Sequence, residues 1–195
     1  MKIIPIEGQL RSEFGKKASR QIRSEGKVPG VIYGGKENIH FTATPKELKP
    51  IIYTPEFNEA QIKIGGKTYT CILKDLQYDK LTDEVSHVDF LELVPGKPVN
   101  ANVPLKFVGQ SKGVKAGGRF EVKVSAVNIR TNPENLRAQI EVDITDLEIG
   151  KNLRMEDIKY DGAEILHNKR IPVAAVVITR ALKQEATETA KAAKK

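Results

Sequence analysis

A hairpin pattern at residues 60–73, AQIKIGGKTYTCIL, places the strongest constraint on the fold. Ile62 and Ile64 alternate with polar residues, and Gly65 and Gly66 suit the positive φ angles of a tight turn, after which the chain returns. Five further segments have strand patterns: 84–93, 103–109, 120–130, 136–144 and 171–179. Many short strands separated by glycine and proline predict antiparallel sheets or barrels rather than βαβ units.

Two short helices are expected among these strands, at residues 15–25 and 44–52. Thr44 suits the N-cap of the second helix and Pro45 its first position. Residues 28–30 are interpreted as the segment that ends the first helix, and residues 31–33 as a short strand. The segment LVPGKPVNANVP, at 93–104, predicts a domain boundary. We therefore expect a mainly β protein with short helices, a first domain at 1–92, a second at 93–180 and a flexible tail at 181–195.

Several function classes lose support from composition and motifs. Cys71 is the only cysteine, so an intramolecular disulfide and a CxxC site are both excluded. The histidines, His40, His87 and His167, are far apart in sequence, and no nucleotide-binding glycine motif follows a strand into a helix. No apolar run approaches the roughly 18 residues of a membrane span, and the N-terminus lacks a signal-peptide pattern. We expect a cytoplasmic protein without metal, cofactor, membrane or small-molecule substrate.

Positive charge is concentrated near the start of the chain. The formal net charge is +7, and the stretch from Arg11 to Lys27 holds six basic and two acidic residues. On a helix, Lys16, Arg20 and Arg23 fall within about 60° of each other, and Ile22 faces another side, where it can dock on the domain. From charge alone, a solvated helix face and a site for an anion remain equally open.

The strand EVSHVDF carries two polar residues on one face. Alternation places His87 and Asp89 outward together and Val88 and Phe90 inward. The outward pair fits either half of a catalytic triad or a pair that bonds to base edges. No nucleophile motif accompanies it, which favours base reading over catalysis. For Tyr33, spacing alone favours a core position.

Three segments together resemble a known family: RSEFGKKASRQIRSEGKVPGVIYGG at 11–35, LKDLQYDKLTDEVSHVDFLEL at 73–93 and LEIGKNLRMEDI at 147–158. They are similar to the Ctc family, named as a stress-protein family, whose members are long, two-domain forms of the bacterial large-subunit ribosomal protein that binds 5S ribosomal RNA. The resemblance implies an N-terminal antiparallel β-barrel followed by a second β-rich domain. It also implies a non-enzymatic protein of the bacterial ribosome. Its barrel would bind loop E of 5S rRNA, with neighbouring large-subunit rRNA and proteins as further partners.

The resemblance also implies a set of RNA-binding residues, with basic side chains meeting the backbone and Tyr33, Gln77, His87 and Asp89 approaching bases or riboses. The full set is Arg11, Lys16, Lys17, Ser19, Arg20, Arg23, Tyr33, Gln77, His87 and Asp89.

Two features depart from the family pattern. Gln21 stands where the family often has a second arginine, and the loop at 78–84 is acidic and would repel phosphates unless its carboxylates turn away. Two other functions stay open. The barrel resembles the anticodon-binding domain of glutaminyl-tRNA synthetases, so it could be a tRNA-binding module, and His87 with Asp89 could serve a small hydrolase.

Overall fold

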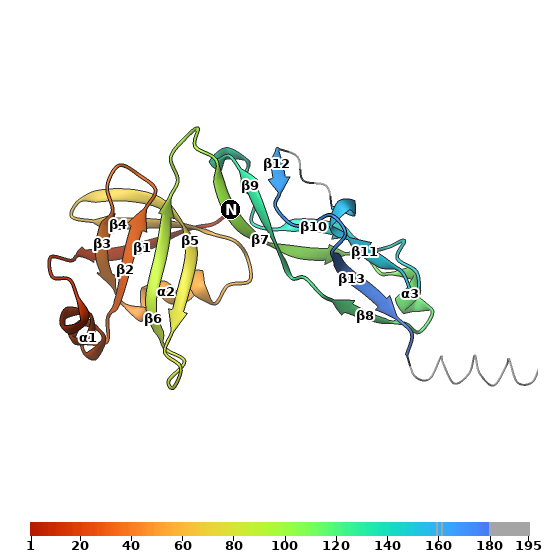
Figure 1. The fold of residues 1–195 in the computed structure, drawn as a ribbon, viewed down its shortest axis with the longest axis horizontal. Helices are drawn as coiled ribbons and strands as arrows, with labels where there is room; N and C mark the ends of the chain where they lie inside the picture. The colour runs from red at the N-terminus through yellow and green to blue at the C-terminus, as the bar shows by residue number, and fades with distance from the viewer. Residues whose placement is uncertain (159, 161, 180–195) are drawn as a thin grey trace, which may run out of the picture. The chain divides into compact units, whose positions relative to one another are not determined.

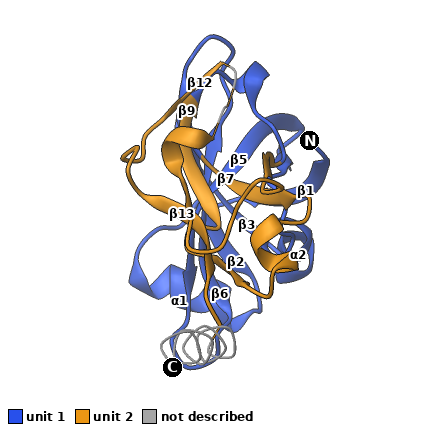
Figure 2. Cartoon of the chain, turned by 90° about the vertical axis from the view of Figure 1, so that its right-hand side faces the viewer, with its two compact units in different colours: residues 1–101, 131–138 blue, residues 102–130, 139–195 orange. Residues whose placement is uncertain are grey.

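The computed structural model describes residues 1–158, 160 and 162–179, and most of its regular structure is β-strand (Figure 1). The chain divides into two compact units, residues 1–101 with 131–138 and residues 102–130 with 139–195 (Figure 2). The first cut lies inside strand β7 (Val99–Val108). The domain bounds 1–92 and 93–180 stay a prediction, and the predicted tail at 181–195 lies outside the described residues.

The first unit contains a closed six-stranded barrel. Around it, in order, run β1 (Ile3–Leu10), β3 (Ile39–Ala43), β2 (Val28–Tyr33), β6 (Val85–Glu92), β5 (Lys67–Tyr78) and β4 (Glu59–Ile64). The expected hairpin is confirmed as β4 and β5, with Gly65 at φ 55° and Gly66 at φ 82°. The barrel is not wholly antiparallel, because β1 pairs with β4, and β2 with β6, in parallel. Tight turns force antiparallel neighbours, whereas these two pairs join strands distant in sequence.

Apolar side chains fill the barrel, as expected for a chain without tryptophan. The rings of Phe41 and Phe90 lie 6.0 Å apart, centroid to centroid. Gly30 lies against them, since an added Cβ would come within 2.7 Å of Val88 Cγ2 and 2.8 Å of Phe41 Cζ. The centre of this core is fully buried and includes Ile6, Ile32, Phe41, Ile62 and Phe90.

Both predicted helices form, as α1 (Lys16–Ser24) and α2 (Pro45–Ile52). Helix α2 begins with a capping box between Thr44 and Glu47, as its sequence indicates. The prediction that residues 28–30 end the first helix is wrong, because α1 ends at Ser24. Gly26, at φ 74°, donates its N–H to the Arg23 carbonyl, so the helix stops there and residues 28–30 are buried in β2. No helix among the described residues is long and apolar enough to cross a membrane.

The second unit is built on two small sheets. One has the order β10 (Ile140–Asp143), β7, β9 (Ala126–Thr131) and β12 (Ala163–Ile165); the other has the order β11 (Asn152–Arg154), β13 (Pro172–Val177) and β8 (Arg119–Val122). The segment 120–130, interpreted as one strand, is divided between β8 and β9 in different sheets. The strand breaks because the N–H groups of Lys123 and Val124 both donate to the Val173 carbonyl. Two 3-10 turns, Pro133–Asn135 and Met155–Asp157, also form among the described residues.

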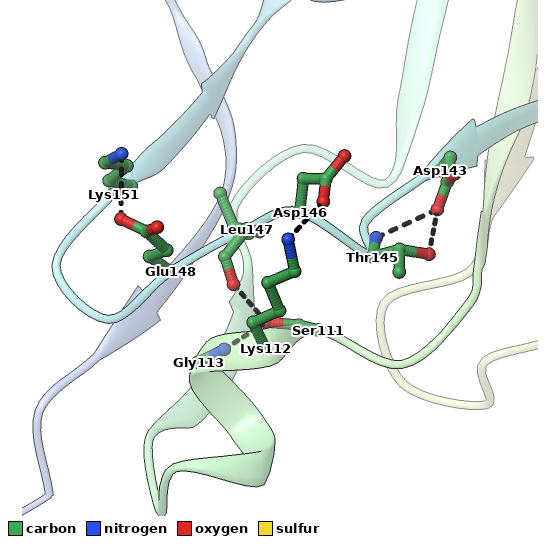
Figure 3. Close-up of polar contacts among 9 residues, drawn as sticks. All are labelled: Ser111, Lys112, Gly113, Asp143, Thr145, Asp146, Leu147, Glu148 and Lys151. Atoms are coloured by element: carbon green, nitrogen blue, oxygen red, sulfur yellow. Dashed lines mark hydrogen bonds and ion pairs between the residues drawn. The ribbon is translucent and has the colours of Figure 1, made fainter.

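A buried serine organises one end of this unit, beside the short helix α3 (Lys112–Lys115). Ser111 is 1% exposed, and its hydroxyl donates to the Leu147 carbonyl at 2.6 Å and accepts from the N–H of Gly113 at 3.1 Å (Figure 3). Lys112 forms a 2.7 Å ion pair with Asp146 on the surface above. The segment 147–158, one of the three that carry the family resemblance, therefore contributes to the packing of this unit.

We predict that Gly30→Ala lowers the free energy of unfolding by about 1–3 kcal/mol, since the new methyl group has no room between Val88 and Phe41. Urea denaturation of the full chain measures this. Lys63→Ala, on the exposed side of β4, is the control and should change stability by less than about 0.5 kcal/mol. Equal stability of Gly30→Ala and the wild type would contradict the close packing.

Candidate nucleic-acid interface

Helix α1 presents its cations on one side, as its periodicity predicts. Lys16, Arg20 and Arg23 are exposed, and we call them the basic stripe; Lys17 is exposed as well. Ala18 is half-buried on the opposite side, together with Ile22, the predicted docking residue. In the part of the chain that the structure describes, no ion pair neutralises the stripe. Its charge is therefore available to an anionic partner.

The N-terminus of α1 is open. Gly15 occupies the N-cap at φ 99°, a conformation that favours glycine, and no described side chain caps the first turn. The first turn also lacks acidic residues. Unpaired N–H groups at a helix N-terminus attract anions, and here lysines stand beside them. Ser19 braces this end, because its hydroxyl donates to the Gly15 carbonyl at 2.9 Å and accepts from Arg11 Nη2 at 2.8 Å.

The other end of the helix is tied to the barrel. Arg23 Nε donates to the Ser86 carbonyl of β6 at 2.9 Å. The Ser86 hydroxyl in turn donates to the Gln77 carbonyl of β5 at 3.1 Å. Because a guanidinium has five N–H donors, this contact leaves others for a ligand. The basic stripe is thus fixed beside the outer surface of β5 and β6.

Five polar side chains gather on that outer surface: Tyr33, Asp75, Gln77, His87 and Asp89. We call them the polar face. Cross-strand register pairs Gln77 with His87 and Asp75 with Asp89, and β2 runs along the other side of β6. His87 and Asp89 are half-buried and alternate with the buried residues of β6, as predicted. The spacing argument for Tyr33 in the core was wrong, since Tyr33 is half-buried beside the fully buried Ile32.

Charge on the polar face is negative. The pKa of Tyr33 is raised, first by desolvation and then by the carboxylates of Asp89 and Asp75, which disfavour a phenolate nearby. His87 Nδ1 lies 2.6 Å from Asp89 Oδ1, and the two side chains are 25% and 28% exposed. Despite this distance, the orientation of the imidazole does not make a hydrogen bond. The two side chains are in close contact, and Nδ1 itself is shielded from solvent.

Asp75 is the residue of this surface that sequence reasoning missed. It lies two positions before Gln77 on β5, so strand alternation could have placed both on one face. The signal was weakened by a register shift between Leu73 and Asp75, where the regular alternation of β5 is interrupted. Asp75 also accepts a hydrogen bond from the N–H of Leu76 at 2.9 Å, which orients its carboxylate.

One carboxylate of the acidic loop between β5 and β6 forms hydrogen bonds within the loop. Asp79 accepts from the N–H groups of Leu81, at 2.9 Å, and Thr82, at 3.4 Å. These bonds, with the nearby Arg23, hold the pKa of Asp79 below its usual range. The carboxylate is committed to the loop backbone, so the acidic loop is a folded feature with a structural role.

Two side chains on β5 and β6, those of Cys71 and Ser86, carry nucleophilic groups, and neither is suited to catalysis with His87 and Asp89. The thiol of Cys71 is fully buried, and desolvation, with the charge of Glu92, raises its pKa to about 12. Such a thiol is protonated near neutral pH and unreactive. The Ser86 hydroxyl already donates to a main-chain carbonyl. Neither group therefore supplies the His–Asp pair with a nucleophile.

Two segments of the chain match known protein families. Residues 6–90 match the Ribosomal L25p family, and residues 98–180 match the C-terminal domain of ribosomal protein TL5. The large ribosomal subunit protein bL25 of Cytophaga hutchinsonii is 38% identical over 191 residues, which cover 98% of this chain and all of the relative. Those of Amoebophilus asiaticus and Porphyromonas gingivalis are 37% and 33% identical and also align over 96% of this chain, covering 96% and 99% of their own lengths.

A barrel of L25p type followed by a TL5-type domain defines a two-domain ribosomal protein. The chain belongs to the bL25 family of large ribosomal subunit proteins, in its long form. The resemblance to Ctc proteins is therefore confirmed. This is a structural family of bacterial ribosomes, which work in the cytoplasm, and its members are not enzymes. That membership excludes the hydrolase alternative.

We predict that Asp89→Asn lowers the pKa of Tyr33, because the Asp89 carboxylate has the larger effect of the two that disfavour the phenolate. Asp75→Asn should lower the pKa less. NMR titration of ¹³C-labelled tyrosine measures both. Asp83→Asn is the control, since Asn tolerates the positive φ of this loop position and Asp83 is not among the groups acting on Tyr33. An unchanged Tyr33 titration in Asp89→Asn would contradict the described polar face.

Proposed function

We propose that this protein binds 5S rRNA, at the loop E region, through its first unit. The observation that carries the proposal is the Arg23–Ser86 hydrogen bond, which fixes the basic stripe beside the polar face. Cations on one side and hydrogen-bonding groups on the other suit a ligand with phosphates next to base edges. Membership in a family of large ribosomal subunit proteins supports an rRNA as that ligand.

In this proposal, helix α1 and Arg11 contact the phosphate backbone of the RNA. Lys16, Lys17 and the open helix N-terminus offer point charges and N–H groups, and Arg20 offers a guanidinium fork for bidentate phosphate contact. Ser19 acts as a positioning residue, because it holds the Arg11 guanidinium at 2.8 Å. A-form RNA presents a wide, shallow minor groove, which accommodates such a helix and sheet surface.

The polar face contacts the bases and riboses of the RNA in this proposal. Asp89 accepts hydrogen bonds, so it favours amino groups of bases or ribose hydroxyls and opposes phosphates. The Gln77 amide, the neutral His87 imidazole and the Tyr33 hydroxyl can each donate and accept hydrogen bonds. The opposite charges of the two surfaces would orient the RNA, with its backbone over the helix and base edges over the strands.

The second unit is proposed to contact neighbouring rRNA or proteins of the large subunit. The alternative ligand of the first unit is tRNA, as the anticodon-binding domain comparison suggests. Competition between 5S rRNA and tRNA for the protein decides between them. Preference for tRNA would favour the alternative.

We predict that the affinity for 5S rRNA falls with salt at a log–log slope of about −3 to −4, as about four or five phosphate contacts require. Filter binding with the full chain over a series of salt concentrations measures the slope. Transfer RNA serves as the comparison ligand at each salt concentration. Salt-insensitive binding, or equal affinity for 5S rRNA and tRNA, would refute the proposal.

A division of roles gives a second prediction. Lys16→Ala should weaken binding to all RNAs alike and reduce the salt slope by about one, because it removes one phosphate contact. Asp89→Ala should weaken binding to 5S rRNA by roughly 1–3 kcal/mol and reduce discrimination among loop E variants. Binding of these variants to matched wild-type and mutated 5S rRNA checks both. Lys63→Ala, an exposed lysine on β4, should change neither property.

The division of roles requires that the two substitutions affect RNA binding in different ways. If Lys16→Ala and Asp89→Ala change affinity by the same factor for every RNA tested, the helix and the polar face do not divide backbone contact from base reading.

A further inference from the structure

An aromatic ring stands in solvent immediately before the basic helix. Phe14 lies in the loop between β1 and α1 and is 63% exposed. Exposing a phenyl ring to water is unfavourable, and aromatic residues are scarce here, at 6% of the chain. Phe14 was not among the residues that sequence reasoning assigned to RNA binding.

The ring is held in place from two sides. The Arg11 guanidinium carbon lies 5.8 Å from the Phe14 ring centroid, within cation–π range. Arg11 is itself fixed, because its Nε donates to the Glu13 carbonyl at 2.7 Å and its Nη2 to the Ser19 hydroxyl at 2.8 Å. The His40 ring packs against Phe14 at 70°, with centroids 5.0 Å apart. We call Arg11, Phe14 and His40 the Phe14 platform.

The platform lies in line with the polar face. The main-chain N–H of Arg11, one residue past the end of β1, donates to the His40 carbonyl of β3 at 3.0 Å, so the two residues are neighbours. Across the barrel surface His40 pairs with Val31, Val31 pairs with Asp89, and Asp89 pairs with Asp75. One row of outward positions therefore connects the platform to the polar face, and the basic stripe begins two residues after Phe14.

We propose that Phe14 stacks on an unpaired base of the bound RNA. The inference rests on the proposed function, because it extends the same surface by one contact. Proteins recognise unpaired bases by stacking them on aromatic rings, often with an arginine alongside, and the platform supplies both. A base inside a duplex has both faces covered by its neighbours, so the partner is a looped-out or unstacked nucleotide. Two side-chain contacts fix the ring beforehand, while most of its surface stays open.

The first test is the affinity of the full chain for 5S rRNA at fixed salt. Phe14→Ala should weaken binding roughly 5- to 100-fold, the range that loss of one stacked base produces. Phe14→Leu should weaken it too, because leucine keeps apolar area but has no π face, whereas Phe14→Trp should retain it. No variant changes charge, so the salt slope should stay constant. Tyr53→Ala, at the end of α2 and 64% exposed in the wild type, should bind as the wild type does.

The second test is spectroscopic. The chain has no tryptophan, so Phe14→Trp carries a single indole reporter at this position. Stacking on a base should quench its fluorescence when 5S rRNA is added, whereas Tyr53→Trp should keep its emission.

The outcomes separate this proposal from the previous one. If the wild type does not bind 5S rRNA, the proposed function itself fails. If the wild type binds and both Phe14→Ala and Phe14→Leu bind equally well, the stacking contact is overturned and the proposed function stands. Loss of affinity in Phe14→Ala without quenching in Phe14→Trp would also overturn stacking.

Discussion

The parallel pairing of β2 with β6 is the constraint on which the rest of the first unit depends. It brings the strand that follows helix α1 against the strand that carries His87 and Asp89, although more than fifty residues separate them. The close approach needs Gly30, since no side chain fits between Val88 and Phe41. With β2 in this position, α1 lies near enough for Arg23 to reach the Ser86 carbonyl. The arrangement of the whole candidate interface therefore follows from one strand contact in the core.

The sequence patterns correctly predicted the features that depend on interactions between residues close in the chain. The Gly65–Gly66 hairpin, the Thr44 cap and the outward side of β6 follow from φ preferences, capping and alternation, which need no distant partner. The parallel pairings and the position of Tyr33 depend on contacts far apart in sequence, which periodicity does not encode. Asp75 was obscured by an irregularity in its own strand. Its place on the polar face follows from cross-strand register with Asp89.

The two faces of the candidate interface carry opposite charge, and this favours specificity over affinity. Basic side chains on α1 attract any RNA backbone, whereas Asp75 and Asp89 repel phosphates. In the proposed complex, an RNA would gain full affinity only if its base donors reached the carboxylates while its phosphates lay over the helix. A wrong RNA would leave the half-buried Asp89 carboxylate without a base donor, and that cost would discriminate against it.

Ion pairing distinguishes the cations of α1 from four cations of the second unit. In the second unit the cations Lys106, Lys112, Lys151 and Arg154 each lie within ion-pair distance of a carboxylate on the same unit. Partnered charges present a weaker field to an external anion than unpartnered ones. On α1, Lys16 and Arg20 have no such partner in the described part of the chain. An exposed cluster of like charges destabilises an isolated helix, and a bound polyanion removes that repulsion. A bound polyanion would therefore relieve more repulsion on α1 than at these four paired cations of the second unit.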